Sequence, residues 1–304
     1  MTYSIVARDP ETGQLGVASQ SHYFALGRVV TFAQAGVGAV TTQSFVEPGY
    51  GPDGLALMAA GVSAPDALAQ LTEADADREL RQVAMIDASG ATGAFTGSRC
   101  VPSRGELVGE DFVVLGNMLT NDRVVPAMFE GFRAASGDLT ERILAAMDAA
   151  EAAGGDVRGR ISASLVVVGG EAGPRPWSNT LFDLRVDDAE YPLVELRRLV
   201  GLSRAHSIFG TTVFTPGLLS APEPSDGAAL DATLATLAAA ESVIGSDPEP
   251  TFWAGVLLVR AGEIERGREK LLDAIARRPE LRAFVDGVAA VGILPLSAEE
   301  VLAR

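Results

Sequence analysis

The order of the expected strands and helices restricts the fold of this chain more than any other feature of its sequence. Segments with strand-like alternation come in groups, and segments with helical spacing follow in pairs. The expected strands are residues 2–7, 15–19, 29–33, 37–42, 82–87, 92–96, 112–117, 161–168 and 181–186. The expected helices are residues 54–60, 65–71, 124–135, 139–153 and 190–200. Because strands and helices do not alternate one by one, a Rossmann or barrel fold is disfavoured. The order predicts an α+β sandwich in which helices cover antiparallel sheets.

The sequence changes character after about residue 203, which suits the two domains expected of 304 residues. Residues 216–226 are rich in Pro and Ser, as linkers are. All later segments have helical spacing: residues 228–244, 251–261, 264–277, 281–291 and 298–303. We therefore expect an α+β domain over residues 1–202, a linker over 203–225 and a small all-α domain over 226–304. One helical hairpin in the last domain is TPR-like. A single repeat cannot form a solenoid, so we expect a lid, docking or oligomerisation module, and a homo-oligomer.

The charge balance excludes several classes of partner. The chain has 24 Lys and Arg against 40 Asp and Glu, a formal net charge of −16, and it contains no basic run. Nucleic acids and anionic membranes are therefore poor partners. No segment approaches the roughly 18 apolar residues of a membrane span. The first residues do not resemble a signal peptide, and the only cysteine is Cys100, so we expect a cytoplasmic protein.

Catalytic bases are scarce in this chain. The histidines are His22 and His206 and the only lysine is Lys270, which excludes a cysteine-rich zinc site and any mechanism that needs several histidines. A Ser–His–Asp triad is disfavoured because the G-x-S-x-G elbow is absent. We expect no metal and no organic cofactor.

Thr2 supplies a base that composition tables omit. The small side chain after Met1 favours removal of the methionine, which would leave a free N-terminal threonine at the start of a strand. A free α-amine titrates near pH 7.7–8.0 and can act as the base for the hydroxyl of its own residue. The alternative is that Thr2 is an ordinary strand residue, since many proteins begin with Met-Thr.

Several spaced motifs resemble one bacterial family. The motifs are TYSIVARDPETGQLGVASQS, GVGAVTTQSFVEPGYGPDGLALM, AFTGSRC, LGNML, AAGGDVRGRISASLVVV and DLRVDD. Together they span about residues 2–200 and resemble the domain of unknown function numbered 1028, placed in the N-terminal-nucleophile (Ntn) hydrolase superfamily. The resemblance implies a four-layer αββα fold with Thr2 as nucleophile. Similar C-terminal tails in this family have been labelled peptidoglycan-binding, but no feature of this tail suits a glycan, so we do not expect a peptidoglycan partner.

The same resemblance implies supporting groups around Thr2. An acidic residue and a Lys or Arg commonly assist the nucleophile, yet Lys270 lies in the C-terminal part, which leaves Arg8, Arg28 and Arg160. The second strand ends in polar residues where a proteasome-like protein would have Asp. We expect Ser19, Ser21 and His22 there to contact substrate.

Further candidates come from glycines and strand ends. Gly38 either donates a backbone N–H to an oxyanion or only permits close packing. Asn117 and Gln43 offer amides to the oxyanion or the substrate, or they merely close strand ends. Arg160 and Ser162 share a face by the period of two, so they either point at the nucleophile or belong to a structural turn.

Two functions remain open from the sequence. The first is an Ntn-type hydrolase that cleaves an amide-like C–N bond in a small molecule, with Thr2, Gly38, Asn117, Arg160 and Ser162 as its machinery. The second is a non-catalytic binding or assembly protein on the same scaffold, with a helical tail that binds partners or, less expected, peptidoglycan.

Overall fold

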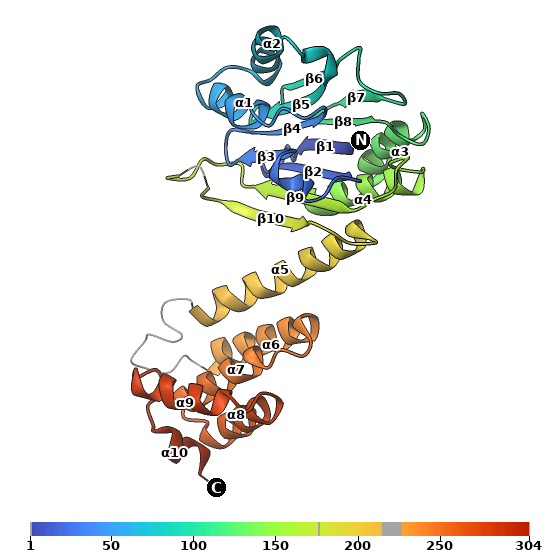
Figure 1. Cartoon of the computed structure of the whole chain (residues 1–304). Coiled ribbons are helices and arrows are strands. Elements are labelled where there is room, and N and C mark those ends of the chain that lie inside the picture. The colour runs from blue at the N-terminus through green and yellow to red at the C-terminus, as the bar shows by residue number, and fades with distance from the viewer. Residues whose placement is uncertain (1, 176, 215–226, 304) are drawn as a thin grey trace. The chain divides into compact units, whose positions relative to one another are not determined.

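A computed structural model describes residues 2–175, 177–214 and 227–303 of the chain. The chain divides into two compact units, Met1–Leu199 and Val200–Arg304 (Figure 1). Each unit has its own buried core.

The first unit contains two antiparallel sheets. The six-stranded sheet has the order β10-β9-β2-β1-β8-β7. Its strands are β1 (Thr2–Arg8), β2 (Leu15–Ser21), β7 (Gly105–Gly109), β8 (Phe112–Asn117), β9 (Ser162–Val168) and β10 (Thr180–Val186). The four-stranded sheet has the order β3-β4-β5-β6. Its strands are β3 (Thr31–Gln34), β4 (Gly38–Ser44), β5 (Arg81–Asp87) and β6 (Thr92–Thr96).

The two sheets pack face to face between two pairs of helices (Figure 1). Helices α1 (Tyr50–Ala59) and α2 (Ala64–Ala74) cover the four-stranded sheet. Helices α3 (Val124–Ala134) and α4 (Leu139–Ala152) cover the six-stranded sheet. The short 3-10 helices η1 (Leu26–Arg28) and η2 (Arg78–Leu80) lie in loops. This arrangement confirms the predicted α+β class and its four αββα layers.

Strand β7 is absent from the sequence prediction. It is a five-residue edge strand, and its side chains Leu107 and Val108 are exposed. A short edge strand has no buried face, so it leaves no alternating pattern for sequence reasoning to detect.

The layer between the sheets is apolar at one end and polar at the other. In β1, Val6 belongs to a buried apolar cluster with Leu15 and Ile86, whereas Thr2 and Ser4 are buried polar residues. Along each strand every second residue faces this layer, so the polar ends of several strands gather in one region. The buried polar residues of this region include Thr2, Ser4, Ser19, Ser21, Gln43, Gln82, Asn117, Ser162 and Ser164.

Helix α5 (Pro192–Phe214) extends well beyond the predicted helix over residues 190–200. The predicted linker over 203–225 is therefore wrong for residues 203–214, and its remainder, residues 215–225, lies outside the described residues. The prediction missed Ala205, Phe209 and Val213, which recur every fourth residue and are all buried. That spacing places them on one face of a helix.

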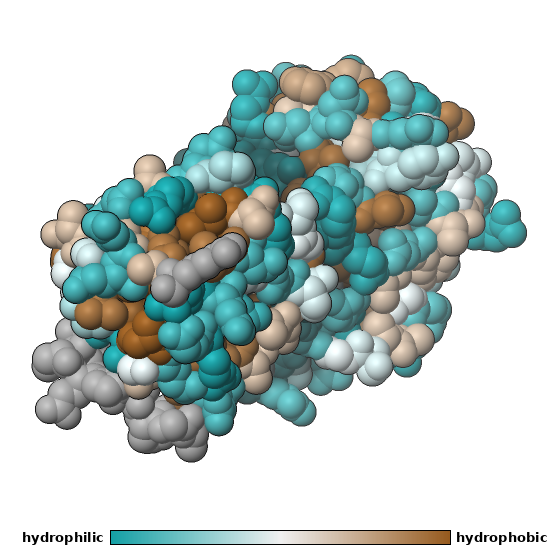
Figure 2. Space-filling view, turned by 90° about the horizontal axis from the view of Figure 1, so that it is seen from below, coloured by the Kyte–Doolittle hydropathy of each residue, from teal (hydrophilic) through white to brown (hydrophobic). Residues whose placement is uncertain are grey.

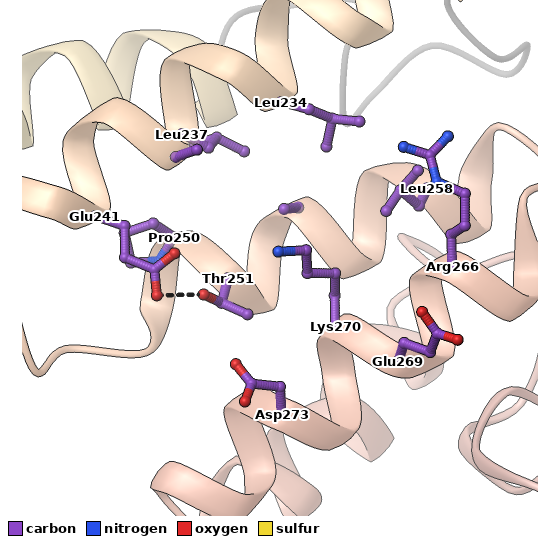
Figure 3. A pocket seen from close by; sticks show the side chains of 12 residues that line it. Leu234, Leu237, Glu241, Pro250, Thr251, Leu258, Arg266, Glu269, Lys270 and Asp273 are labelled. Carbon is purple, nitrogen blue, oxygen red and sulfur yellow. Dashed lines mark hydrogen bonds between the residues drawn. The ribbon is translucent and has the colours of Figure 1, made fainter.

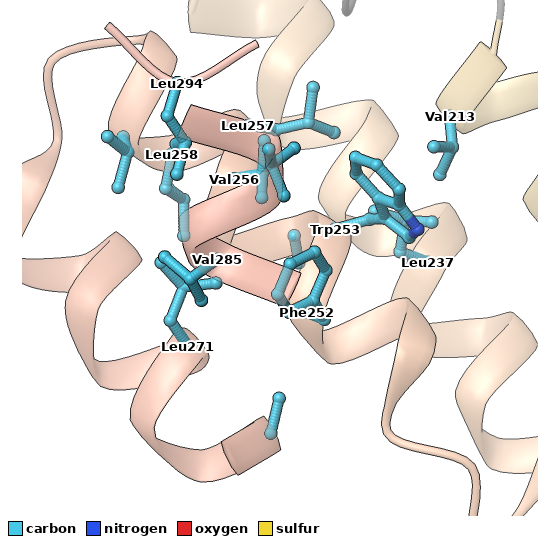
Figure 4. Close-up of a cluster of buried hydrophobic side chains, with 14 of the residues drawn as sticks. Val213, Leu237, Phe252, Trp253, Val256, Leu257, Leu258, Leu271, Val285 and Leu294 are labelled. Atoms are coloured by element: carbon cyan, nitrogen blue, oxygen red, sulfur yellow. The ribbon is translucent and has the colours of Figure 1, made fainter. Parts of the chain in front are cut away.

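The second unit is all helical, as predicted. Besides the end of α5 it contains α6 (Gly227–Ile244), α7 (Glu249–Arg260), α8 (Ile264–Arg277), α9 (Leu281–Ala290) and α10 (Ala298–Leu302). Helix α7 is central, and its side chains Phe252 and Trp253 pack edge to face with ring centroids 5.4 Å apart (Figure 4). Aliphatic side chains such as Leu237, Leu271 and Val285 surround them (Figure 4).

Helices α7 and α8 approach closely at two glycines, and this predicts a large difference between two Gly→Ala variants. A Cβ at Gly267 would lie 2.6 Å from Val259 Cγ2 and 2.8 Å from the Gly255 carbonyl oxygen, whereas a Cβ at Gly287 in α9 would meet nothing within 4 Å. Ala favours a helix over Gly by about 1 kcal/mol, but overpacking costs about 1–3 kcal/mol. We expect Gly267→Ala to destabilise this unit and Gly287→Ala to stabilise it, with about 2 kcal/mol between them in urea unfolding followed by Trp253 fluorescence. Equal stabilities would contradict the close packing.

The surface on the face seen in Figure 2 is mostly hydrophilic, with hydrophobic side chains in patches. Within the described residues, no helix combines the length and hydrophobicity needed to cross a membrane.

Candidate functional site

Thr2 lies at the polar end of the inter-sheet layer, at the start of the central strand β1. It is paired with Ser21 of β2 on one side and with Asn117 of β8 on the other. Its side chain is only 5 % exposed, and its hydroxyl donates a hydrogen bond to Ser21 Oγ at 3.2 Å. The neighbouring strands therefore hold the Thr2 hydroxyl in one direction.

Gln43 connects the four-stranded sheet to Thr2. Its side-chain Nε2 donates to the Thr2 carbonyl oxygen at 3.2 Å and to Gln82 Oε1 at 2.7 Å. Its Oε1 accepts a hydrogen bond from the Ser4 hydroxyl at 2.5 Å. Gln43 is 1 % exposed, so these contacts are shielded from water.

Gln82 sets the orientation of the surrounding amides. Its Nε2 lies 3.0 Å from the Gly116 carbonyl oxygen and 3.2 Å from the Gly105 carbonyl oxygen. Because carbonyl oxygens only accept, the amide of Gln82 must point its NH₂ group at them. Its Oε1 consequently faces Gln43 and Asn117, and both of these side chains must donate to it.

One buried hydrogen-bond acceptor, on the strand neighbour Asn117 of Thr2, has no partner among the described residues. Asn117 Nδ2 donates to Gln82 Oε1 at 3.0 Å, which turns Asn117 Oδ1 away from Gln82. That Oδ1 atom is buried and has no partner within the described residues. A buried acceptor without a partner costs about 1–3 kcal/mol, so it indicates a donor that arrives later. The Asn117 amide carries two N–H donors and this bond uses one of them, so the prediction that Asn117 donates to an oxyanion stays a prediction.

The predicted serines lie in the same polar region but have different partners. Ser19 Oγ is 2.5 Å from Ser4 Oγ, and Ser21 Oγ receives the Thr2 hydroxyl. Ser162 Oγ donates to the Tyr23 carbonyl oxygen at 2.5 Å and accepts the Leu26 N–H at 3.3 Å. Ser162 therefore holds the loop after β2. Among the hydrogen bonds of the described residues, Ser21 is the serine that bonds to the Thr2 hydroxyl.

His22 follows Ser21 at the same end of the sheet. Its backbone N–H donates to Asp156 Oδ2 at 3.1 Å. Its ring Nδ1 is buried and has no hydrogen-bond partner within the described residues. His22 thus follows the residue that pairs with Thr2 in the sheet, but its backbone hydrogen bond holds the loop around Asp156.

Gly38 is not near Thr2. It begins β4, whereas Gln43, which contacts Thr2, lies five residues further along, or about 16 Å on an extended strand. A Cβ at Gly38 would meet Met58 and the Ile86 carbonyl oxygen. The oxyanion role predicted for Gly38 is therefore wrong, and close packing explains this glycine.

Arg160 is also directed elsewhere. It precedes β9, which begins at Ser162, so the period of two does not apply to it. Its guanidinium forms an ion pair with Glu151 of α4, donates to the Glu190 carbonyl oxygen at 2.9 Å and lies over the Tyr191 ring. These partners are on the helix side of the six-stranded sheet, so Arg160 does not point at the nucleophile, which was the first of its two predicted roles.

The Arg160 ion pair belongs to a half-buried network that connects β1 to α4, on the face of the sheet opposite Thr2. The Tyr3 hydroxyl donates to Glu151 Oε2 at 2.6 Å, and Gln20 Nε2 donates to the same oxygen at 2.5 Å. Burial and the Glu151 charge raise the pKa of Tyr3 well above its ordinary value. Burial alone would raise the pKa of Glu151, but hydrogen bonds from Tyr3, Arg160 and Gln20 outweigh it and lower that pKa. The network holds the strand that carries Thr2 against α4.

Arg8 is a second correction among the predicted basic partners. It lies at the opposite end of β1 from Thr2 and pairs with Asp111 at 3.1 Å. Arg28 lies in η1, within the loop that leaves β2 beside Thr2. Across the described residues, no cluster of three His, Cys, Asp or Glu side chains could hold a metal ion.

Gln82 and the Tyr3 network are the features that sequence reasoning missed. Gln82 is the second residue of β5, directly before an apolar run, and it faces inward. A polar side chain at a buried position is the signal that could have identified it.

Backbone strain marks the same end of the sandwich. Ser44 follows Gln43 with φ 73°, Met118 follows Asn117 with φ 51°, and Ala25 has φ 53° in the loop after β2. Non-glycine residues in this region of φ are uncommon, and they cluster at functional sites.

Comparison with known proteins places these residues in one family. A family model described as "Family of unknown function (DUF1028)" matches residues 2–196. A crystal structure of a protein from Silicibacter pomeroyi, described with the same family, is similar with a TM-score of 0.59 and 29 % identity, over 73 % of this chain and 91 % of that chain. No curated protein matches this chain.

Proposed function

Because the chain belongs to the family of unknown function DUF1028, whose model covers the whole αββα unit from Thr2 onward, we propose an Ntn-type hydrolase that cleaves an amide-like C–N bond. The substrate is a small molecule. One observation carries the proposal: the Thr2 hydroxyl, at the start of a central strand, lies beside a buried amide acceptor that has no partner among the described residues.

The proposed reaction uses Thr2 alone as nucleophile and base. Cleavage of the peptide bond before Thr2 frees its α-amine, which accepts the hydroxyl proton while Oγ1 attacks the substrate carbonyl carbon. The C–N bond then breaks, and the amine passes its proton to the leaving nitrogen. Water hydrolyses the resulting ester and restores the free hydroxyl.

The surrounding side chains have distinct positioning roles in this proposal. Ser21 orients the Thr2 hydroxyl, and Gln43 holds the Thr2 carbonyl oxygen. Asn117 Oδ1 accepts a hydrogen bond from the protonated α-amine, which stabilises the charge formed during attack. Gln82 keeps Asn117 in the orientation that this requires.

The state of the N-terminus tests the proposal most directly. We expect the full chain, produced without an N-terminal tag, to begin at Thr2. Intact-mass measurement and sequencing of the first peptide check this. A residue retained before Thr2 in protein that hydrolyses amides would contradict the mechanism.

A second candidate function is partner binding by the helical unit, which would make the chain an assembly protein or a homo-oligomer. A pocket of about 390 Å³ lies between α6, α7 and α8 (Figure 3). Leu234 and Leu237 line one wall, while α8 lines the opposite wall with both basic and acidic side chains, Arg266, Glu269, Lys270 and Asp273. An apolar wall facing a wall of mixed charge suits an amphipathic segment of a partner that carries both apolar and charged side chains. This candidate expects Thr2→Ala to leave function intact, and the hydrolase expects the opposite.

A further inference from the structure

Five large hydrophobic side chains are exposed on loops at the Thr2 end of the sandwich, and they form what we term the apolar rim. Tyr23 is 48 % exposed, Phe24 66 %, Phe45 50 %, Val101 38 % and Val157 62 %. Single exposed hydrophobic residues are normal on protein surfaces, so the grouping is the feature that needs a reason.

Two loops that carry rim residues follow β2 and β4, and both of these strands contact Thr2. Tyr23 and Phe24 follow Ser21, which pairs with Thr2 in the sheet. Phe45 follows Gln43, whose side chain binds the Thr2 carbonyl oxygen. Two residues of chain span at most about 7 Å, so Tyr23 and Phe45 begin close to the nucleophile.

The other two rim residues, Val101 and Val157, are hydrogen-bonded to the residue that follows Asn117, a strand neighbour of Thr2. Asn117 pairs with Thr2, and the next residue is Met118. The Met118 N–H donates to the Val101 carbonyl oxygen at 3.2 Å, and the Val157 N–H donates to the Met118 carbonyl oxygen at 3.4 Å. The rim therefore surrounds the end of β1 from three strands and from both sheets.

The apolar rim is hydrophobic, whereas the site around Thr2 beneath it is lined by polar side chains. Beneath the rim, the buried polar side chains bond to one another and to the backbone, and Asn117 Oδ1 is among the buried side-chain atoms that have no partner within the described residues. Ligand sites of this kind, an apolar wall around a few convergent polar groups, recognise a molecule with one polar reacting group and an apolar body.

We infer that the substrate carries an apolar acyl group, aromatic or alkyl, which lies on the rim while its amide reaches Thr2. This inference rests on the proposed hydrolase function. A polar or charged acyl group would leave the aromatic rings of Phe24 and Phe45 exposed to water, so it would gain little from them.

Two β-lactone probes test the inference on the full chain. The probes differ only in the ring substituent, phenylethyl in one and the neutral carboxamidoethyl in the other. Attack by Thr2 Oγ1 forms an ester while the acyl C–O bond of the ring breaks, and the released oxygen takes the proton, so the adduct has the full mass of the lactone. We expect the phenylethyl probe to label Thr2 at least about tenfold faster, as measured by intact mass and peptide mapping.

Rim variants separate the inference from the proposed function. In Phe24→Ser/Phe45→Ser we expect the ratio of the two labelling rates to fall close to one. The control Val108→Ser, which alters a side chain 54 % exposed on β7, should keep the wild-type ratio. Labelling of Thr2 at equal rates by both probes in the wild type, or an unchanged ratio in the double variant, would overturn the inference and leave the hydrolase standing.

Two other outcomes would also overturn the inference of an apolar acyl group. Absence of any adduct on Thr2 with either probe overturns the hydrolase and this inference together. A double variant that changes the molar mass in light scattering but keeps the rate ratio makes the rim an interface between copies of the chain, which also overturns the inference.

Discussion

Thr2→Ala is expected to lower amide hydrolysis by at least about a thousandfold, because it removes the attacking oxygen itself. Thr2→Ser keeps a hydroxyl and an α-amine and should retain measurable activity. Release of p-nitroaniline from a panel of acyl p-nitroanilides measures turnover, and the phenylethyl β-lactone measures acylation alone. The rate should rise with pH as the α-amine loses its proton near pH 8.

A matched control separates chemistry from folding. Thr180 also begins a strand but is exposed, so Thr180→Ala should leave turnover unchanged. In Thr2→Ala the lost hydrogen bond to Ser21 is worth about 1 kcal/mol, which is too little to unfold the unit. Equal turnover in Thr2→Ala and in the wild type would remove Thr2 from the mechanism and favour the partner-binding function.

Gln82→Leu is expected to produce the largest loss of stability in the αββα unit, about 4 kcal/mol in the free energy of unfolding. The substitution removes the donor to the Gly105 and Gly116 carbonyl oxygens and the acceptor for Gln43 and Asn117. Each buried polar group left without a partner costs about 1–3 kcal/mol, and part of that cost is relieved by relaxation. Urea unfolding of the full chain, followed by far-UV circular dichroism, measures the loss.

Two further variants show whether orientation is the cause. Gln70→Leu changes an exposed side chain of α2 and should alter the free energy of unfolding by less than about 0.5 kcal/mol. Gln82→Glu keeps the acceptor but turns a carboxylate oxygen toward two carbonyl oxygens, so it should be at least as destabilising as Gln82→Leu. If Gln82→Leu cost less than about 1 kcal/mol, the amide orientations would not depend on Gln82.

Much of the fold follows from local patterns. The alternation in Thr2–Arg8 and Leu15–Ser21 predicts strands, and both are found. The edge strand Gly105–Gly109 escaped prediction because its exposed side chains carry no pattern. The end of α5 was mistaken for a linker, although buried residues recur there at helical spacing.

The candidate site was less predictable than the fold. Thr2 and its strand neighbour Ser21 were predicted, and pairing brings them together. Gly38 and Arg160 were assigned to the site but lie elsewhere. The position of Gly38 depends on which end of β4 faces Thr2, and that of Arg160 on which side of the sheet it faces; no local pattern records either.

The sequence by itself determined which side chains share a face, because alternation along a strand is a property of the local backbone. It thereby determined that Thr2 and Ser4 point the same way and that Tyr3 points oppositely. Only the tertiary structure decided that Gln43 and Gln82, from the second sheet, meet Thr2 and Asn117. Those contacts require two sheets to stack with their polar ends together, and the burial of apolar side chains over the whole layer, rather than any one segment, determines that alignment.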